Sequence, residues 1–382
     1  MAEHPTCPFA AFRPAAEDLA ALAAEVAEIP ELQRLLVERD DHLKLPDRVA
    51  HQYQIAGGKV VLEIAPELPA ELAGIGLFEA GARHEGVGRL STCLGTPHAE
   101  TDPDFLGLMA AFATARGRRV DFLALNEPAF PANDHREFMD VLHATGESAG
   151  APNLVVQQAK FAAALASRRG ALQGAKTLAH VLGQSARTSH STAFQSYWTG
   201  IEEIGGSGAR FNLVPVRDEK RHAGPAAGKH PVSEEWAQLQ AAGDVVFELF
   251  WIPFLSEQET PTERLTEAWR EDHKKKVGRL IFPRTDLTSP ESRLWAALAS
   301  EMGANPGNWV HDRDDTIGEP ATRFGAARKI AYGLSQKGRD ALAPELYRTV
   351  FTTGRIDSAL AAELARRREE KERVGQESWA SG

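Results

Sequence analysis

Short strand-like runs recur over residues 59–283 and limit the fold more than any other part of the sequence. Most of them show apolar residues in alternation or many β-branched residues, and Gly or Pro stands in the gaps. Two runs meet across Arg116-Gly117-Arg118, which predicts a hairpin over 106–126. This spacing favours an α+β fold with a closed antiparallel β-barrel over a βαβ sheet. The seven runs lie at 59–65, 85–92, 106–114, 118–126, 209–216, 244–254 and 277–283.

Helical segments are predicted before, between and after these runs. The Ala- and Leu-rich stretch at 15–40 is broken at Pro30, because a proline inside a helix removes a hydrogen bond and clashes with the preceding turn. The mixed segment at 217–232 is predicted to be a loop. Further helices are predicted at 154–185, 288–303, 321–337, 343–351 and 356–373.

Size and charge narrow the classes of function. A chain of 382 residues with 43% hydrophobic residues is long enough to bury a deep core as one large domain or two smaller ones. The formal net charge of −10 argues against nucleic acid or an anionic membrane as the main partner. No stretch of about 18 apolar residues is present, so no membrane span is expected.

Cysteine content and the first residues suggest a compartment. Cys7 and Cys93 are the two cysteines, too few for a disulfide framework or for a zinc site without other ligands. The start Met-Ala-Glu-His-Pro has neither a basic region nor an apolar run, so it does not resemble a secretory signal. We therefore expect a cytoplasmic location.

A tyrosine near the end of the chain has an arginine at helical spacing. Arg328 and Tyr332 are four residues apart, and positions i and i+4 share one face of a helix. A neighbouring cation favours the anionic form of a phenol, whose pKa in water is roughly 10. A tyrosinate oxygen suits ferric iron, and tyrosine is one of the proximal ligands of haem iron. The pair therefore raises the hypothesis of a haem site with His51 on the opposite face.

The order of several further segments resembles the haem catalases, and most closely a short, divergent catalase-related branch. The resemblance covers roughly residues 45 to 340, and each segment matches a family motif in turn. The matching segments are Arg48-Val-Ala-His51, Gly76-Leu-Phe78, Gly88-Arg89-Leu-Ser-Thr92, Asp104-Phe-Leu-Gly-Leu-Met-Ala110, Asp121-Phe-Leu-Ala-Leu-Asn-Glu-Pro-Ala-Phe130, Pro261-Thr-Glu263 with Trp269, 277–283, and Arg328-Lys-Ile-Ala-Tyr332 with Arg339.

The resemblance implies a fold and a cofactor. It predicts an eight-stranded barrel, so one strand beyond the seven is expected, and a b-type haem with ferric iron. Tyr332 would be the axial metal ligand and Arg328 its charge partner. Arg48, Arg89 and Arg339 match three arginines that pair with the haem propionates, a task that suits the guanidinium fork.

It also implies roles on the distal side of the haem. His51 would take the proton of a bound peroxide and return it to the leaving oxygen. Ser91 matches the serine that orients this imidazole, and Phe138 stands at the spacing of a ring that stacks on haem. The family has two asparagines where this chain has Leu125-Asn126. A register shift would let Asn126 act as the peroxide-orienting amide.

Three departures from the family bear on the substrate. Leu125 stands where the first of those asparagines is expected, and Ala50 precedes His51 where catalases usually have valine. Gln52-Tyr53-Gln54-Ile55 replaces a glycine-rich stretch. These changes point away from fast disproportionation of hydrogen peroxide. They favour slower peroxidase-type work, or a larger organic hydroperoxide.

The sequence thus predicts a haem-dependent, catalase-related oxidoreductase acting on hydrogen peroxide or organic hydroperoxides. Two alternatives remain: an enzyme that rearranges or cleaves fatty-acid hydroperoxides or serves a biosynthetic pathway, and a haem-binding barrel without turnover. The predicted division is an N-terminal helical arm at 1–44, a haem barrel domain at 45–340, and C-terminal helices and tail at 341–382. Catalase relatives usually form homo-oligomers, and the altered C-terminal region leaves that state open here.

Overall fold

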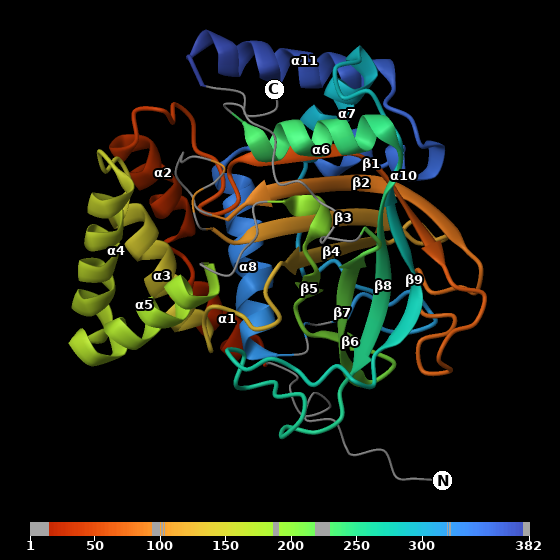
Figure 1. The fold of residues 1–382 in the computed structure, drawn as a ribbon, viewed down its shortest axis with the longest axis horizontal. Coiled ribbons are helices and arrows are strands. Elements are labelled where there is room, and N and C mark those ends of the chain that lie inside the picture. The colour runs from red at the N-terminus through yellow and green to blue at the C-terminus, as the bar shows by residue number, and fades with distance from the viewer. Residues whose placement is uncertain are drawn as a thin grey trace.

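Eight antiparallel strands close into a β-barrel (Figure 1). The structure is a computed structural model that describes residues 15–93, 100, 102, 104–185, 191–217, 230–318, 320 and 322–376. Around the barrel, each strand pairs with the next, and the pairing of β5 with β7 and of β9 with β1 completes the ring. The strands are β1 (Gln54–Ile64), β2 (Arg83–Thr92), β3 (Leu106–Ala113), β4 (Arg119–Leu125), β5 (Tyr197–Thr199), β7 (Ser207–Pro215), β8 (Val245–Pro253) and β9 (Lys275–Phe282).

The seven predicted strands are confirmed, and β5 is the eighth. This strand has three residues, too few to show an alternating pattern in the sequence. A further short strand, β6 (Glu202–Ile204), pairs only with β7 and stands outside the ring. The predicted hairpin is β3 and β4, whose register runs from Gly107 opposite Leu125 to Ala113 opposite Arg119. The α+β barrel fold is therefore confirmed.

Aromatic side chains fill the barrel. The ring of Phe122 meets those of Phe211 and Trp309 edge to face, with centroids 5.5 and 5.2 Å apart. Phe78 stacks on Phe211 at 5.2 Å. Glycine at position 86 makes room for this core, because a Cβ there would lie 2.2 Å from the Ala111 carbonyl oxygen. The barrel is therefore a packed core and does not itself hold the cavities described below.

One group of helices packs beside the barrel and against α8 (Arg323–Gly338), which lies between the barrel and the helices α2–α5 (Figure 1). Helices α1 (Ala16–Glu25), α2 (Ile29–Arg39) and α3 (His135–Ser148) share one apolar core with it. As predicted, the helical stretch is interrupted near Pro30. This proline stands in the first turn of α2, where a missing N–H costs no hydrogen bond. Helix α3 was not predicted.

The predicted helix at 154–185 is two helices, α4 (Leu154–Arg169) and α5 (Ala171–Ser185). Gly170 separates them at a φ of 76°, a left-handed conformation that glycine adopts without steric cost. The two helices pack against each other and against α3. Figure 1 shows this pair at the outer edge of the molecule, away from the barrel.

The remaining helices cover the outside of the barrel (Figure 1). Helix α7 (Pro290–Glu301), the short α9 (Pro344–Tyr347) and α10 (Val350–Thr353), and α11 (Ser358–Arg373) bury apolar residues against β2 and β3. Helix α6 (Pro231–Ala242) was not predicted and packs beside β1. The predicted loop at 217–232 falls mostly on 218–229, and these residues, like Cys7, lie outside the described part of the chain.

None of the helices in the described part of the chain has both the length and the apolar character needed to cross a bilayer. The division into an arm, a barrel domain and C-terminal helices stays a prediction. Residues of α1 and α2 share a core with α8, so the arm packs on the helix that carries Tyr332.

Candidate functional site

Eight of the nine predicted site residues line one cavity, which we call the central cavity. It lies between the ends of β2–β4, the segment before β1, and helices α2, α3 and α8. Its empty volume is about 1160 Å³, including the part that opens to solvent. The eight residues are Arg48, His51, Arg89, Ser91, Phe138, Arg328, Tyr332 and Arg339.

His51 is held in an unusual backbone conformation. Its φ is 63°, which residues other than glycine adopt rarely and which is common at functional sites. Its backbone N–H donates to the Cys93 carbonyl at 2.9 Å, and its Nδ1 lies 3.2 Å from the Ser91 hydroxyl oxygen. Burial, followed by the charges of Arg89, Arg48 and Arg328, lowers the pKa of His51 to about 3. The imidazole is therefore neutral near pH 7.

Gly107 gives this imidazole its space. A Cβ at Gly107 would lie 2.6 Å from both Nδ1 and Cε1 of His51, and 3.2 Å from the Ser91 hydroxyl. Any side chain on this residue of β3 would displace the ring. Gly107 belongs to a segment that matches the family, but sequence reasoning assigned it no role in the site.

Arg89 fixes the chain on both sides of His51. Its Nη2 donates to the carbonyls of His51 and Gln52 at 2.7 and 3.0 Å, and its Nε donates to the side chain of Gln54 at 3.1 Å. The arginine is 4% exposed. Its guanidinium therefore both faces the central cavity and holds the loop that carries the imidazole.

Arg48 and Arg339 converge on the end of α7. Both donate to the Ser300 carbonyl, at 2.6 and 3.5 Å, and Arg339 also donates to the Met302 carbonyl at 2.9 Å. These carbonyls carry the partial negative charge of a helix C-terminus. Asp47 lies 3.2 Å from Arg48 Nη1. Burial alone would raise the pKa of Asp47, but the neighbouring cations outweigh burial and lower it.

The three arginines leave a surplus of positive charge at this end of the central cavity. Burial and the charge of Arg48 lower the pKa of Arg89 and bring that of Arg339 to about 10. Asp47 is the carboxylate that acts on both. Glu301 also acts on Arg339, but it is held in ion pairs by α11. Buried cations without matching anions suit a ligand that carries carboxylates.

Arg328 and Tyr332 lie one turn apart on α8, as predicted. The Arg328 guanidinium carbon is 5.6 Å from the centroid of the Tyr332 ring, and 5.5 and 5.9 Å from those of Phe130 and Phe324. Among the described residues, neither the Arg328 guanidinium nor the Tyr332 hydroxyl has a hydrogen-bond partner. Phe138 joins this aromatic group, with its ring 5.5 Å from Phe130.

Asn126 does not line the central cavity, which differs from its predicted place. Its side-chain oxygen accepts from Leu106 N at 2.7 Å, and its backbone N–H donates to Leu106 O at 3.0 Å. Successive side chains of a strand point to opposite faces. Leu125, opposite Gly107 in the β3–β4 pair, therefore takes the cavity wall, and the amide is turned away from it.

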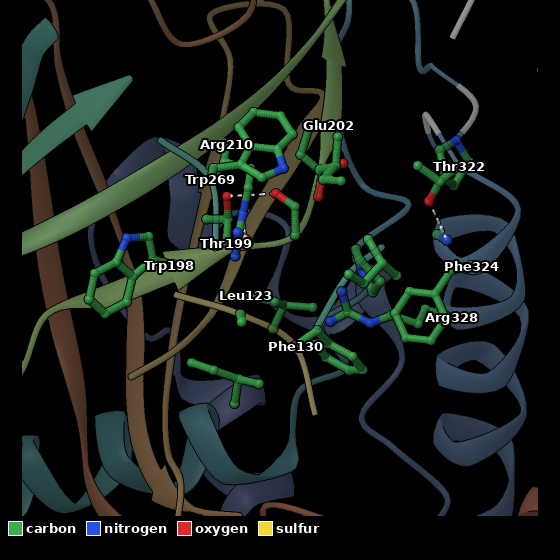
Figure 2. A pocket seen from close by; sticks show the side chains of 18 of the residues that line it. Leu123, Phe130, Trp198, Thr199, Glu202, Arg210, Trp269, Thr322, Phe324 and Arg328 are labelled. Atoms are coloured by element: carbon green, nitrogen blue, oxygen red, sulfur yellow. Dashed lines mark hydrogen bonds between the residues drawn. The ribbon is translucent and has the colours of Figure 1, made fainter. Parts of the chain in front are cut away.

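A second cavity, which we call the lateral cavity, lies beyond Arg328. It has an empty volume of about 720 Å³, including open solvent, and is bounded by β5–β7, the 261–269 loop and the start of α8. Figure 2 shows Arg328 entering it from α8, with Arg210, Thr199 and Glu202 across from it. Leu123, Leu125, Phe130 and Arg328 line both cavities. Part of its wall comes from 121–130 and 261–269, two segments that match the family but to which the sequence analysis assigned no cavity.

Comparison with solved structures identifies the fold, whereas comparison of the sequence does not. Neither the protein-family models nor the curated proteins give a match to the sequence. Solved structures do match. Catalase A from Saccharomyces cerevisiae superposes with a TM-score of 0.61 at 13% identity over 82% of this chain. The chain has a catalase-like fold. A bacterial catalase gives 0.58 at 18% identity over 83%, and a fungal catalase gives 0.56 at 16% over 79%.

The chain spans only part of the length of the proteins whose fold it resembles. It spans 64%, 61% and 62% of their lengths, respectively, which is less than two thirds of each. The described residues contain no group of three or more His, Cys, Asp or Glu side chains that would hold a metal ion.

Proposed function

We propose that this chain is a haem-dependent oxidoreductase that reduces hydroperoxides, with Tyr332 as the ligand of the ferric iron. The supporting observation is that one cavity brings together a phenol without a hydrogen bond, an arginine without an anion, three further arginines and a neutral imidazole. A haem would supply an iron for the phenol and two carboxylates for the arginines.

The residues present fit a b-type haem. Arg48, Arg89 and Arg339 retain N–H groups beyond those given to backbone carbonyls and would pair with the two propionates. The aromatic ring of Phe138 and the apolar walls of the central cavity suit the porphyrin. Arg328 lies beside the Tyr332 ring, where its charge would pair with a tyrosinate bound to iron.

Haem, when bound, supplies the redox-active iron at which the oxygen–oxygen bond of a hydroperoxide breaks. The contribution of the protein side chains is proton transfer. His51 is neutral near pH 7 and accepts the proton of the incoming hydroperoxide. The Ser91 hydroxyl at Nδ1 fixes the ring, so that Nε2 is the nitrogen left to exchange that proton. His51 then returns the proton to the leaving oxygen.

The substrate proposed is an organic hydroperoxide, with hydrogen peroxide as a slower one. Reduction takes two electrons and two protons and yields an alcohol and water, with an organic donor or a second peroxide as the source of electrons. Leu125 replaces the amide that would orient a small peroxide, and Ala50 leaves space beside His51. An apolar wall strengthens the binding of an apolar substrate.

The first test is haem binding by the full chain. We expect one haem per chain and a high-spin ferric absorption spectrum. The bound protein should then reduce cumene hydroperoxide faster than it releases oxygen from hydrogen peroxide. Absence of a Soret band on haem addition rejects the proposal. Conversion of the hydroperoxide to an isomer without an added donor would favour the rearranging enzyme, and haem binding without turnover the non-catalytic barrel.

The second test is His51→Ala. We expect this variant to keep its haem and to lose about 100-fold or more in the rate of its reaction with peroxide, the scale of general acid–base help. An unchanged rate would reject His51 as the distal base while leaving the haem site intact.

A further inference from the structure

We propose that the lateral cavity is a binding site for a small planar aromatic carboxylate, whose carboxylate lies between Arg210 and Arg328 and whose ring contacts the aromatic walls. The site adjoins the central cavity, with which it shares Arg328, Phe130, Leu123 and Leu125, and its occupancy does not depend on the proposed reaction. Figure 2 shows the two arginines approaching the cavity from β7 and from α8.

The guanidiniums of Arg210 and Arg328 would be stabilised by an anion bound between them. Arg210 is buried, and its Nε and Nη1 donate to the carbonyls of Thr199 and Pro128 at 2.9 and 2.6 Å. These acceptors are neutral. Burial first, and the charge of Arg328 as well, lower the pKa of Arg210 to about 10, although Glu271 opposes this. An anion between the two arginines would relieve their repulsion and accept from N–H groups that are still free for bonding.

Glu202 supports the binding of an acid. Its side chain is buried in the wall of the lateral cavity and makes no hydrogen bond or ion pair with any residue in the described ranges. Burial raises its pKa to about 8, although the charge of Arg328 opposes the rise. Near pH 7 the carboxyl is therefore mostly protonated and has an O–H to donate to a carboxylate. Glu127 and Glu267 also line the cavity, and Glu267 is paired with Arg264 at 3.0 Å.

The rest of the wall selects a ring compound over an inorganic anion. Trp269 is fixed by its indole N–H, which donates to the Pro261 carbonyl at 2.7 Å, and the Arg210 guanidinium lies 5.8 Å from its ring centroid. Phe130 and Phe324 face the cavity near Arg328 (Figure 2). An inorganic anion would leave this apolar surface exposed to water, whereas the ring of an aromatic acid would bury it.

Calorimetric titration of the full chain, with and without haem, tests the proposal. The probes are benzoate, its neutral isostere benzamide, and acetate. We expect benzoate to bind the haem-loaded form at one site per chain, because haem then occupies the central cavity, and benzamide and acetate to bind at least tenfold more weakly. Equal binding of benzoate and benzamide, no binding, or loss of benzoate binding on haem loading would each overturn the proposal. The last result would mean that the lateral cavity is part of the haem pocket.

Ile201→Trp and Glu202→Gln locate the probe, with Val216→Trp as a control. Ile201→Trp fills the cavity from its wall and should weaken benzoate at least tenfold, while Val216→Trp, which adds an indole at an exposed position, should not. Glu202→Gln keeps an N–H donor without a charge and should bind benzoate within about threefold of the unaltered protein. Tight binding by Ile201→Trp, or a tenfold loss in Glu202→Gln, contradicts the site. The glutamine variant decides the question alone if the tryptophan variant does not fold.

Discussion

His51 is held by contacts to three of its parts. The Ser91 hydroxyl lies next to Nδ1, Arg89 donates to the His51 carbonyl, and the backbone N–H of His51 donates to the Cys93 carbonyl. Gly107 leaves the space into which the ring fits. The left-handed backbone of a histidine has a cost of about 1 kcal/mol or more, and these contacts offset it.

Gly107→Ala is predicted to damage the site without removing any of its polar groups. The added methyl group would push the imidazole out of line with Ser91, so the peroxide rate of the haem-bound protein should fall by about tenfold or more. Gly58→Ala is the matched control, because a Cβ there meets no atom within 4 Å. Equal rates in the two variants would show that the ring is not confined as described.

Glu202 predicts a pH dependence of stability. Burial raises its folded-state pKa from 4.5 to about 8. Between these values the unfolded chain releases the proton and the folded chain keeps it, so folding stability falls as pH rises from about 4.5 to about 8. Glu202→Gln removes this loss. In denaturant titrations it should be more stable than the unaltered protein by about 4 kcal/mol at pH 7.5, with the gap closing towards pH 4.5. A gap that does not change with pH would contradict the assignment.

At the scale of elements, the long strands and α8 were predictable from the sequence, whereas the short strand β5 and the helices α3 and α6 were not. Most of the barrel strands are eight or more residues long, but β5 has three. The i, i+4 spacing placed Arg328 and Tyr332 on one face correctly. The register of β4 against β3 decides that Leu125 faces Gly107, and a single sequence carries no signal for it. This is why Asn126 was misplaced.

Helix α3 links stability to the site, because it carries Phe138. Its N-cap, Asp134, accepts from the backbone N–H of Glu137 at 2.8 Å. Asp134→Ala should lower the free energy of unfolding by about 1 kcal/mol and weaken haem binding. Asn153→Ala removes the equivalent cap of α4, which lies away from the central cavity, and should cost similar stability with unchanged haem affinity. Equal haem affinities in the two variants would rule out a role of α3 in the site.

At the scale of the whole molecule, the fold brings together groups that are far apart in the chain. The segment before β1 supplies Arg48 and His51, β2 supplies Arg89 and Ser91, and α8 supplies Arg328 and Tyr332. Family resemblance predicted this assembly residue by residue. Composition and periodicity alone predicted the barrel, and neither predicted the lateral cavity, whose walls come from separate loops and short strands.

The most direct test of the account is the absorption spectrum of haem-loaded Tyr332→Phe beside that of Tyr347→Phe, which removes a buried phenol oxygen away from both cavities. We predict that Tyr347→Phe keeps the high-spin ferric spectrum of a tyrosinate-bound haem and that Tyr332→Phe loses it. An unchanged spectrum in Tyr332→Phe would contradict the central claim, because the iron would then have another ligand.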